Sequence, residues 1–179
     1  FYCFRQLFMV FYCIYVLLGA LFINVKMIDL FIGYQVFLLI LTNLTCYFFL
    51  KRHLKRNDLC FLLSLFVLLS SIFFQFHKQV MFVNYMPFLF LMLRSIDHYF
   101  INHHFTGIII WGSCIVLHSY FYCIACFIVC FIYFVMQCAN HKEYKKPLFH
   151  LLIAYVGIVL LTAIYTIPTL YVIAGGSKS

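Results

Sequence analysis

A run of 34 residues, 105–138, contains no Asp, Glu, Lys or Arg, and it constrains the fold more than any other part of the chain. As one straight helix this run would be about 50 Å long, whereas the hydrocarbon core of a bilayer is about 30 Å thick. We therefore expect a break inside the run, either at Gly112-Ser113 or at the polar point His118-Ser119.

Other apolar runs reach or approach the length of about 20 residues that a helix needs to cross a membrane. Of the 179 residues, 67% are hydrophobic and only 9% are charged, which is too little charge to cover the surface of a soluble domain. The sequence therefore predicts an all-α, polytopic transmembrane helical bundle with about six apolar segments, of which one or two are broken or re-entrant.

Short polar or basic stretches separate the expected segments. We expect a single transmembrane domain over residues 1–174, a flexible tail at 175–179, and a chain that is a fragment of a longer protein. Residues 94–104 are expected to form a basic turn. Pro87 marks a kinked or re-entrant element, and Pro168 interrupts the last segment. The segments are expected at about 7–25, 30–50, 59–76, 80–93, 105–138 and 148–174.

The charge pattern gives a topology prediction. The chain has twelve Lys and Arg residues and four Asp and Glu residues. The cations lie mostly between apolar runs, where contact with lipid headgroups explains them. We therefore expect no nucleic-acid partner. The densest cluster, 51–58, predicts a cytoplasmic loop. Six simple crossings would divide the cations seven to five between the two sides, but nine to three if 105–138 returns to the side it came from. The positive-inside rule thus favours a hairpin-like element there.

Three of the nine cysteines, Cys123, Cys126 and Cys130, have the spacing C-x-x-C-x-x-x-C, which in a soluble chain suggests metal binding. On a helix these residues share one stripe, and inside lipid their thiolates would be desolvated charges. We therefore expect them to pack as small apolar residues, and we expect no metal and no cofactor.

Four of the eight histidines lie between residues 94 and 123. His104 and His118 are 14 residues apart and would share one helix face, so this stretch resembles a haem-bearing helix of cytochrome b proteins, although no second segment carries a spaced pair. HYFINHH is loosely similar to the histidine boxes of membrane desaturases. The order of Pro87, Arg94 and His103 is similar to that in rotary-motor stator subunits. Both families need further polar residues that the other segments lack.

The order of features in the same region supports another interpretation. The charged loop 51–58 precedes an apolar span, the pair Lys78-Gln79 opens the next segment, and a later span carries LHSYF at 117–121. Over roughly residues 30–175 this order resembles the central part of the EpsG-like and Wzy-like exopolysaccharide polymerases. Those proteins are about twice as long, and they typically have arginine at the position of Lys78 and a proline after the histidine.

The resemblance implies a glycosyltransferase-type polymerase of the bacterial inner membrane that joins oligosaccharide repeats carried on a polyprenyl diphosphate. Lys78 and Arg94 would stabilise the departing diphosphate. His118 would be the catalytic base that accepts the proton of the acceptor hydroxyl, and Gln79 and Tyr120 would bind the substrate.

Simpler explanations exist for these residues. Lys78 and Arg94 lie near the ends of apolar runs, where long cationic side chains reach lipid phosphates, and a neutral His118 can bond to a neighbouring helix. The main alternative is a non-catalytic or ion-conducting subunit of an organellar respiratory or ATP-synthase complex, bound to other subunits in the mitochondrial inner membrane. The many Phe, Tyr and Cys residues are also typical of such organelle-encoded subunits.

Overall fold

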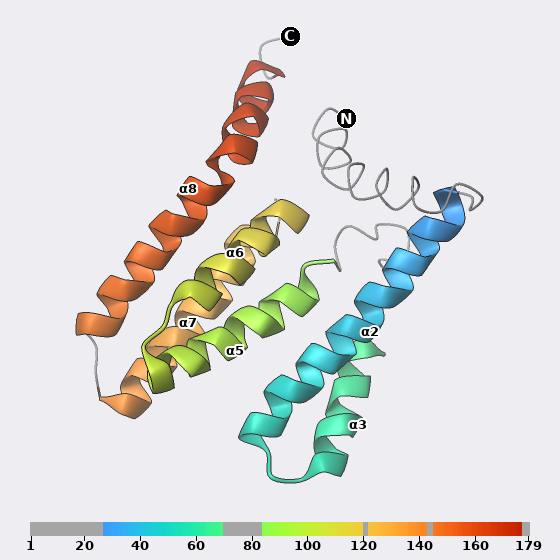
Figure 1. Ribbon diagram of the computed structural model, residues 1–179, viewed down its shortest axis with the longest axis vertical. Helices are drawn as coiled ribbons and strands as arrows, with labels where there is room; N and C mark the ends of the chain where they lie inside the picture. The colour runs from blue at the N-terminus through green and yellow to red at the C-terminus, as the bar shows by residue number, and fades with distance from the viewer. Residues whose placement is uncertain (1–26, 70–83, 120–121, 143–144, 177–179) are drawn as a thin grey trace.

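The computed structural model describes residues 27–69, 84–119, 122–142 and 145–176, and every regular element in these ranges is an α-helix (Figure 1). The all-helical prediction is therefore confirmed for this part of the chain. The expected first segment, about 7–25, lies outside the described residues. The helices are α2 (Met27–His53), α3 (Asn57–Leu68), α5 (Met86–Asn102), α6 (Thr106–His118), α7 (Cys123–His141) and α8 (Lys145–Gly176).

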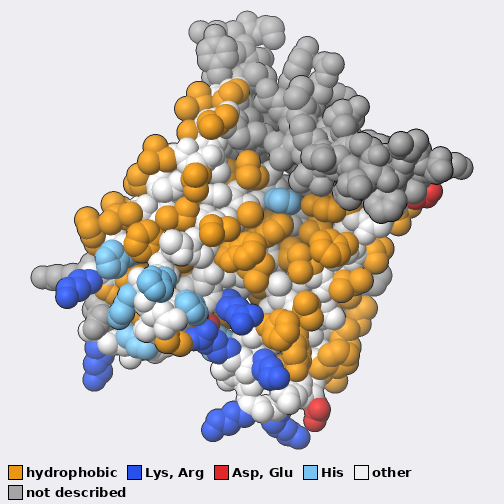
Figure 2. All heavy atoms as spheres, in the orientation of Figure 1, with side chains coloured by type: hydrophobic (Ala, Val, Ile, Leu, Met, Phe, Trp, Pro, Cys, Tyr) orange, Lys and Arg blue, Asp and Glu red, His pale blue; other side chains and the backbone are white. Residues whose placement is uncertain are grey.

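Three stretches in these ranges are long and apolar enough to cross a membrane: Ile32–His53 in α2, Cys123–His141 in α7 and Lys146–Ile164 in α8. The helices α3 and α6 are apolar but shorter. Large apolar side chains are exposed on α2, α7 and α8, as expected where lipid is the solvent. Figure 2 shows apolar side chains over much of one face of the molecule. The structure thus supports a helical membrane bundle, while the number of six crossings stays a prediction.

The uncharged run 105–138 is broken, as its length predicted. Of the two expected break points, the chain uses the second: α6 ends at His118, Ser119 has extended backbone angles (φ −150°, ψ 89°), and α7 begins at Cys123. The two helices run in opposite directions (Figure 1). The predicted break is therefore confirmed, while the return of this run to the same side of the membrane stays a prediction.

Gly112 lies inside α6 and permits a close crossing with α8. A Cβ atom at Gly112 would overlap Cδ1 of Ile158, and one at Gly157 would lie 3.1 Å from Cδ1 of Ile109. Two glycines on facing helices thus each receive an isoleucine of the other helix, which is the small-residue packing typical of helices in membranes.

The prediction of a basic turn at 94–104 was wrong, because α5 continues through Asn102. Within this stretch only His103 adopts a left-handed conformation (φ 57°). The polar residues of this stretch have helical rather than turn periodicity. Asp97 and Tyr99 are buried, whereas Arg94 and His98 are exposed. One side of the helix therefore packs in the bundle while the other remains polar.

Neither of the two notable prolines breaks its helix. Pro87 lies in the first turn of α5, where the missing N–H has no intrahelical partner to lose, so no kink results. Pro168 lies inside α8, which continues to Gly176, so the expected interruption at this residue was wrong.

The cysteines of α7 form part of the core. Cys123, Cys126, Cys130 and Cys138 are buried with free thiols along the same stripe as Phe134. This confirms the prediction that the C-x-x-C-x-x-x-C residues pack as small apolar side chains.

Contacts between helices show that α2, α5 and α7 run in the same direction. His53 at the end of α2 meets Asp97 near the end of α5, and both meet Tyr133 in the second half of α7. The ends of these helices and the starts of α3, α6 and α8 therefore share one end of the bundle, which we call the basic end (residues 51–57, 97–106 and 137–147). We call the other end, at residues 84–88 and 115–123, the opposite end.

Figure 2 shows the Lys and Arg side chains, and most of the His side chains, gathered toward the basic end. Among the described side chains, no Lys or Arg belongs to the opposite end. Because α6 and α7 are antiparallel, Lys142 lies at the same end of the bundle as residues 51–58, which is the arrangement that the charge division favours. The described cations are Lys51, Arg52, Lys55, Arg56, Lys142 and Lys146, with Arg94 one turn before Asp97.

Candidate functional site

Three of the five predicted site residues, Lys78, Gln79 and Tyr120, lie outside the described residues. The structure places the other two, Arg94 and His118. Whether all five converge on one substrate therefore stays a prediction.

His118 is the last residue of α6 and lies at the opposite end. Its Nδ1 is 2.9 Å from the carbonyl oxygen of Cys114, and because a carbonyl only accepts, Nδ1 carries the proton. The ring packs against Phe88 of α5, with centroids 4.4 Å apart. The backbone bond and the aromatic contact are among the interactions that hold the half-buried imidazole at the end of its helix.

Polar and aromatic residues of three helices surround this end. Tyr85 before α5 stacks on Tyr122 before α7, with ring centroids 5.3 Å apart and planes 19° from parallel. Asn84 is one turn before Phe88 and is buried, and its Oδ1 has no hydrogen-bond partner. The starts of α5 and α7 therefore meet where α6 ends at His118.

Arg94 lies elsewhere on α5. Its guanidinium carbon is 5.7 Å from the ring centroid of Phe48 on α2. Arg94 follows Phe88 by six positions, which is about 240° around a helix and about 9 Å along it. Because Phe88 contacts His118, the structure puts Arg94 on a different face of α5 from the one that His118 contacts, and it does not bring the two residues together.

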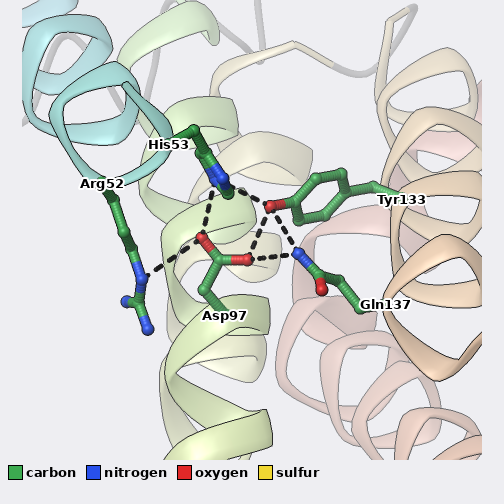
Figure 3. A network of polar contacts seen from close by, with 5 residues as sticks. All are labelled: Arg52, His53, Asp97, Tyr133 and Gln137. Carbon is green, nitrogen blue, oxygen red and sulfur yellow. Dashed lines mark hydrogen bonds and ion pairs between the residues drawn. The ribbon is translucent and has the colours of Figure 1, made fainter. Parts of the chain in front are cut away.

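A second polar cluster, which the sequence analysis missed, centres on Asp97 near the basic end (Figure 3). Oδ1 of Asp97 accepts hydrogen bonds from the Tyr133 hydroxyl at 2.6 Å and from Nε2 of Gln137 at 3.0 Å. Oδ2 lies 3.3 Å from Nε2 of His53 and 3.8 Å from Nε of Arg52. We call these five residues the Asp97 network, and it joins α2, α5 and α7.

The protons of the Asp97 network can be assigned from its geometry. The single hydroxyl proton of Tyr133 points to Asp97, since a carboxylate only accepts. Gln137 donates to the same hydroxyl at 2.9 Å, and Nε2 of His53, 3.1 Å from it, must donate as well. Every group around the carboxylate and the phenol therefore contributes an N–H or O–H, which compensates the burial of a side chain only 4% exposed.

Aromatic side chains enclose the Asp97 network on one side. Phe49 of α2 packs against His53, Tyr133 and Phe90, with centroid distances of 4.9, 5.9 and 6.1 Å. The polar contacts and the aromatic contacts thus join the same three helices.

Histidines of the basic end take part in packing. Nδ1 of His150 hydrogen-bonds the Tyr99 hydroxyl at 2.7 Å and ties α8 to α5, and the ring of His141 stacks on Phe100 at 5.0 Å. Within the described ranges, no group of three or more His, Cys, Asp or Glu residues is arranged to hold a metal ion.

The haem alternative required two histidines on one helix face. His104 instead precedes α6, which begins at Thr106, whereas His118 ends that helix. His118 and His104 therefore do not form the helical pair that the resemblance to cytochrome b proteins assumed.

A signal for the Asp97 network exists in the sequence. Asp97 is the only acid between Asp58 and Glu143, and an acid within apolar segments is costly unless it is paired. Gln137, one turn after Tyr133, is also unusual in an apolar helix. The partners could not be paired from sequence, because they lie on helices distant along the chain.

Comparison with protein-family models, with curated proteins and with solved structures gave no match for this chain. The class of the protein therefore follows from the fold alone: three long apolar helices and two shorter ones, within the described ranges, form a helical membrane protein. The two polar clusters, around His118 and around Asp97, are its candidate functional sites.

Proposed function

We propose that this chain is part of a membrane-embedded polymerase of lipid-linked oligosaccharide repeats, with its reaction centre at the opposite end. The observation that carries the proposal is the position of His118, an ionisable side chain held where the end of α6 meets the starts of α5 and α7. An ionisable group within apolar segments is a functional candidate because it is costly there.

The neighbours of the other predicted residues support this location. Asn84 and Tyr85 begin the described chain after the segment that contains Lys78 and Gln79, and Tyr122 follows Tyr120 closely. The stacking of Tyr85 on Tyr122 therefore joins the segments next to these predicted residues at the end that holds His118.

The proposed chemistry uses His118 as a general base. Because Nδ1 donates to a backbone carbonyl, Nε2 carries the lone pair that takes the proton of the acceptor sugar hydroxyl. The hydroxyl oxygen bonds to the anomeric carbon of the donor while the bond from that carbon to the diphosphate oxygen breaks. Lys78 stabilises the departing anion. Arg94 has no part in this site, since it lies on another face of α5.

The cation distribution supports an orientation for this site. By the positive-inside rule we place the basic end at the cytoplasmic side of a bacterial inner membrane. The end with His118 then faces the outer side, and the polymer is made there.

A second candidate is a non-catalytic subunit of a larger membrane complex, and the Asp97 network favours it. The carboxylate is buried and surrounded by donors of the same chain, which is the arrangement of a cluster that fastens helices together. In such a subunit, His118 would be a structural side chain bonded to its own helix.

The two candidates can be separated in the organism that makes the chain. We expect His118→Ala in the full-length protein to abolish polymer while the protein still accumulates in the membrane. The matched control is His98→Ala, which removes an exposed histidine of the basic end and should leave polymer unchanged. Normal polymer from His118→Ala, or from a strain lacking the chain, would refute the polymerase.

A further inference from the structure

We propose a second site at the basic end: a phosphate-binding site formed by Arg52 of α2 and Arg94 of α5, whose ligand is the phosphate of an anionic lipid headgroup. This arginine site lies on another face of α5 from the Phe88–His118 contact. The inference is therefore independent of the polymerase proposal.

The two arginines occupy adjacent positions along one helix seam. The guanidinium of Arg94 lies over the ring of Phe48, and Nε of Arg52 meets Asp97. Arg52 follows Phe48 by four positions on α2, and Asp97 follows Arg94 by three on α5. Because the helices are parallel, these contacts are about one turn, or ~5 Å, apart. Both guanidiniums thus border the same stretch of the seam, close enough for one phosphate group to contact both.

Asp97 acts in this site as a positioning residue for Arg52. Tyr133 and Gln137 hold Oδ1 of the carboxylate from the α7 side. Oδ2 has no hydrogen bond within the described residues, and it lies near Arg52 and His53 of α2. Arg52 approaches through Nε, and Figure 3 shows its two terminal nitrogens turned away from the carboxylate. A guanidinium held in this way binds a pair of phosphate oxygens with less loss of side-chain entropy.

The surroundings favour a lipid phosphate over a free one. The described side chains toward this end carry seven Lys and Arg against two carboxylates, Asp58 and Asp97, so an anion is attracted there. Phe48, which is 43% exposed, lies directly beside Arg94 on the membrane-crossing helix α2. A ligand with a phosphate head and an apolar tail therefore matches both the arginines and their apolar neighbour.

Native mass spectrometry of the full-length chain in detergent tests the arginine site. The probes are phosphatidic acid, phosphatidylcholine and inorganic phosphate. We expect tight binding of phosphatidic acid, and about tenfold weaker binding for Arg52→Gln and for Arg94→Gln. Arg56→Gln is the matched control, because it removes the same charge from the basic end but is not one of the two arginines of the site. It should change binding less than twofold.

Two conservative variants separate positioning from charge. Arg52→Lys keeps the charge but loses the planar guanidinium group. Asp97→Asn makes the arginine site more positive but releases Arg52. We expect both to weaken binding several-fold, whereas a diffuse charge effect would leave the first unchanged and strengthen the second.

The proposal fails if Arg52→Gln, Arg94→Gln and Arg56→Gln weaken phosphatidic acid binding equally, because a diffuse cationic surface would then suffice. It also fails if phosphatidylcholine binds as well as phosphatidic acid. Displacement of bound phosphatidic acid by millimolar inorganic phosphate would show that the arginine site binds free phosphate, and it would overturn the lipid assignment. None of these outcomes depends on polymer formation.

Discussion

Replacing Asp97 with alanine removes the acceptor of two hydrogen bonds, the ion-pair partner of Arg52 and the neighbour of the His53 imidazole. Each hydrogen bond to a buried carboxylate contributes about 1.5–3 kcal/mol. The contact with Arg52 adds little, because that side chain is 33% exposed and its charge is screened by solvent. The Tyr133 hydroxyl and the Gln137 amide lose their shared acceptor. We therefore expect Asp97→Ala to lower the free energy of unfolding by ~3–5 kcal/mol.

Asp97→Asn separates the charge from the hydrogen bonds. Asparagine keeps the shape and one acceptor oxygen, so Tyr133 and Gln137 retain a partner while the negative charge is lost. We expect a loss of about 1–2 kcal/mol, and a coupling of about 1 kcal/mol with Tyr133→Phe in a double-mutant cycle, since the two side chains are in direct contact.

The measurement is unfolding of the full-length protein in detergent, followed by circular dichroism during titration with denaturant. The matched control is Asp58→Asn, which removes an exposed carboxylate from the first turn of α3 and should cost less than about 0.5 kcal/mol. If Asp97→Ala costs no more than Asp58→Asn, the carboxylate is not buried among these donors in the folded protein. The packing of α2 and α7 on α5 described above would then be refuted.

Two further predictions concern contacts between other helices. Gly112→Ala should destabilise the fold by about 1–3 kcal/mol, because its methyl group would overlap Ile158, whereas Gly33→Ala, with no atom within 4 Å of the new Cβ, should be neutral or slightly stabilising; thermal unfolding of the two variants compares them, and equal melting temperatures would contradict the close crossing of α6 and α8. Tyr99→Phe removes the hydroxyl that bonds His150 and should cost about 0.5–1.5 kcal/mol in the same assay, and an unchanged melting temperature would show that this bond does not hold α8 to α5.

Several features were predictable because their causes are local in sequence. The uncharged run 105–138 is too long for one straight span, and the structure breaks it at the polar pair His118-Ser119. The stripe of Cys123, Cys126 and Cys130 follows from helical spacing, and these residues pack as neutral, small apolar side chains because a thiolate would be costly away from water. The gathering of cations at one end follows from that same hairpin.

The prediction of a turn at 94–104 was wrong because a locally polar stretch can also be one side of a helix. Residues 94–102 are helical, since their polar side chains alternate with buried ones at a helical period. The contacts of Asp97 were not predictable for a different reason. Its partners Arg52 and Tyr133 lie 45 positions before it and 36 after it, so no sequence window contains them together.

The amino-acid sequence by itself determined the class of the protein, an all-helical membrane bundle with one broken span, because lipid imposes the length and composition of each helix independently of its neighbours. Only the tertiary structure decided which polar groups meet. It brought Asp97 into contact with Arg52, His53, Tyr133 and Gln137. It also put Arg94 on a different face of α5 from the one that His118 contacts. The physical reason is that such pairings depend on the order, direction and rotation of packed helices, and these are set by contacts between segments far apart in the chain.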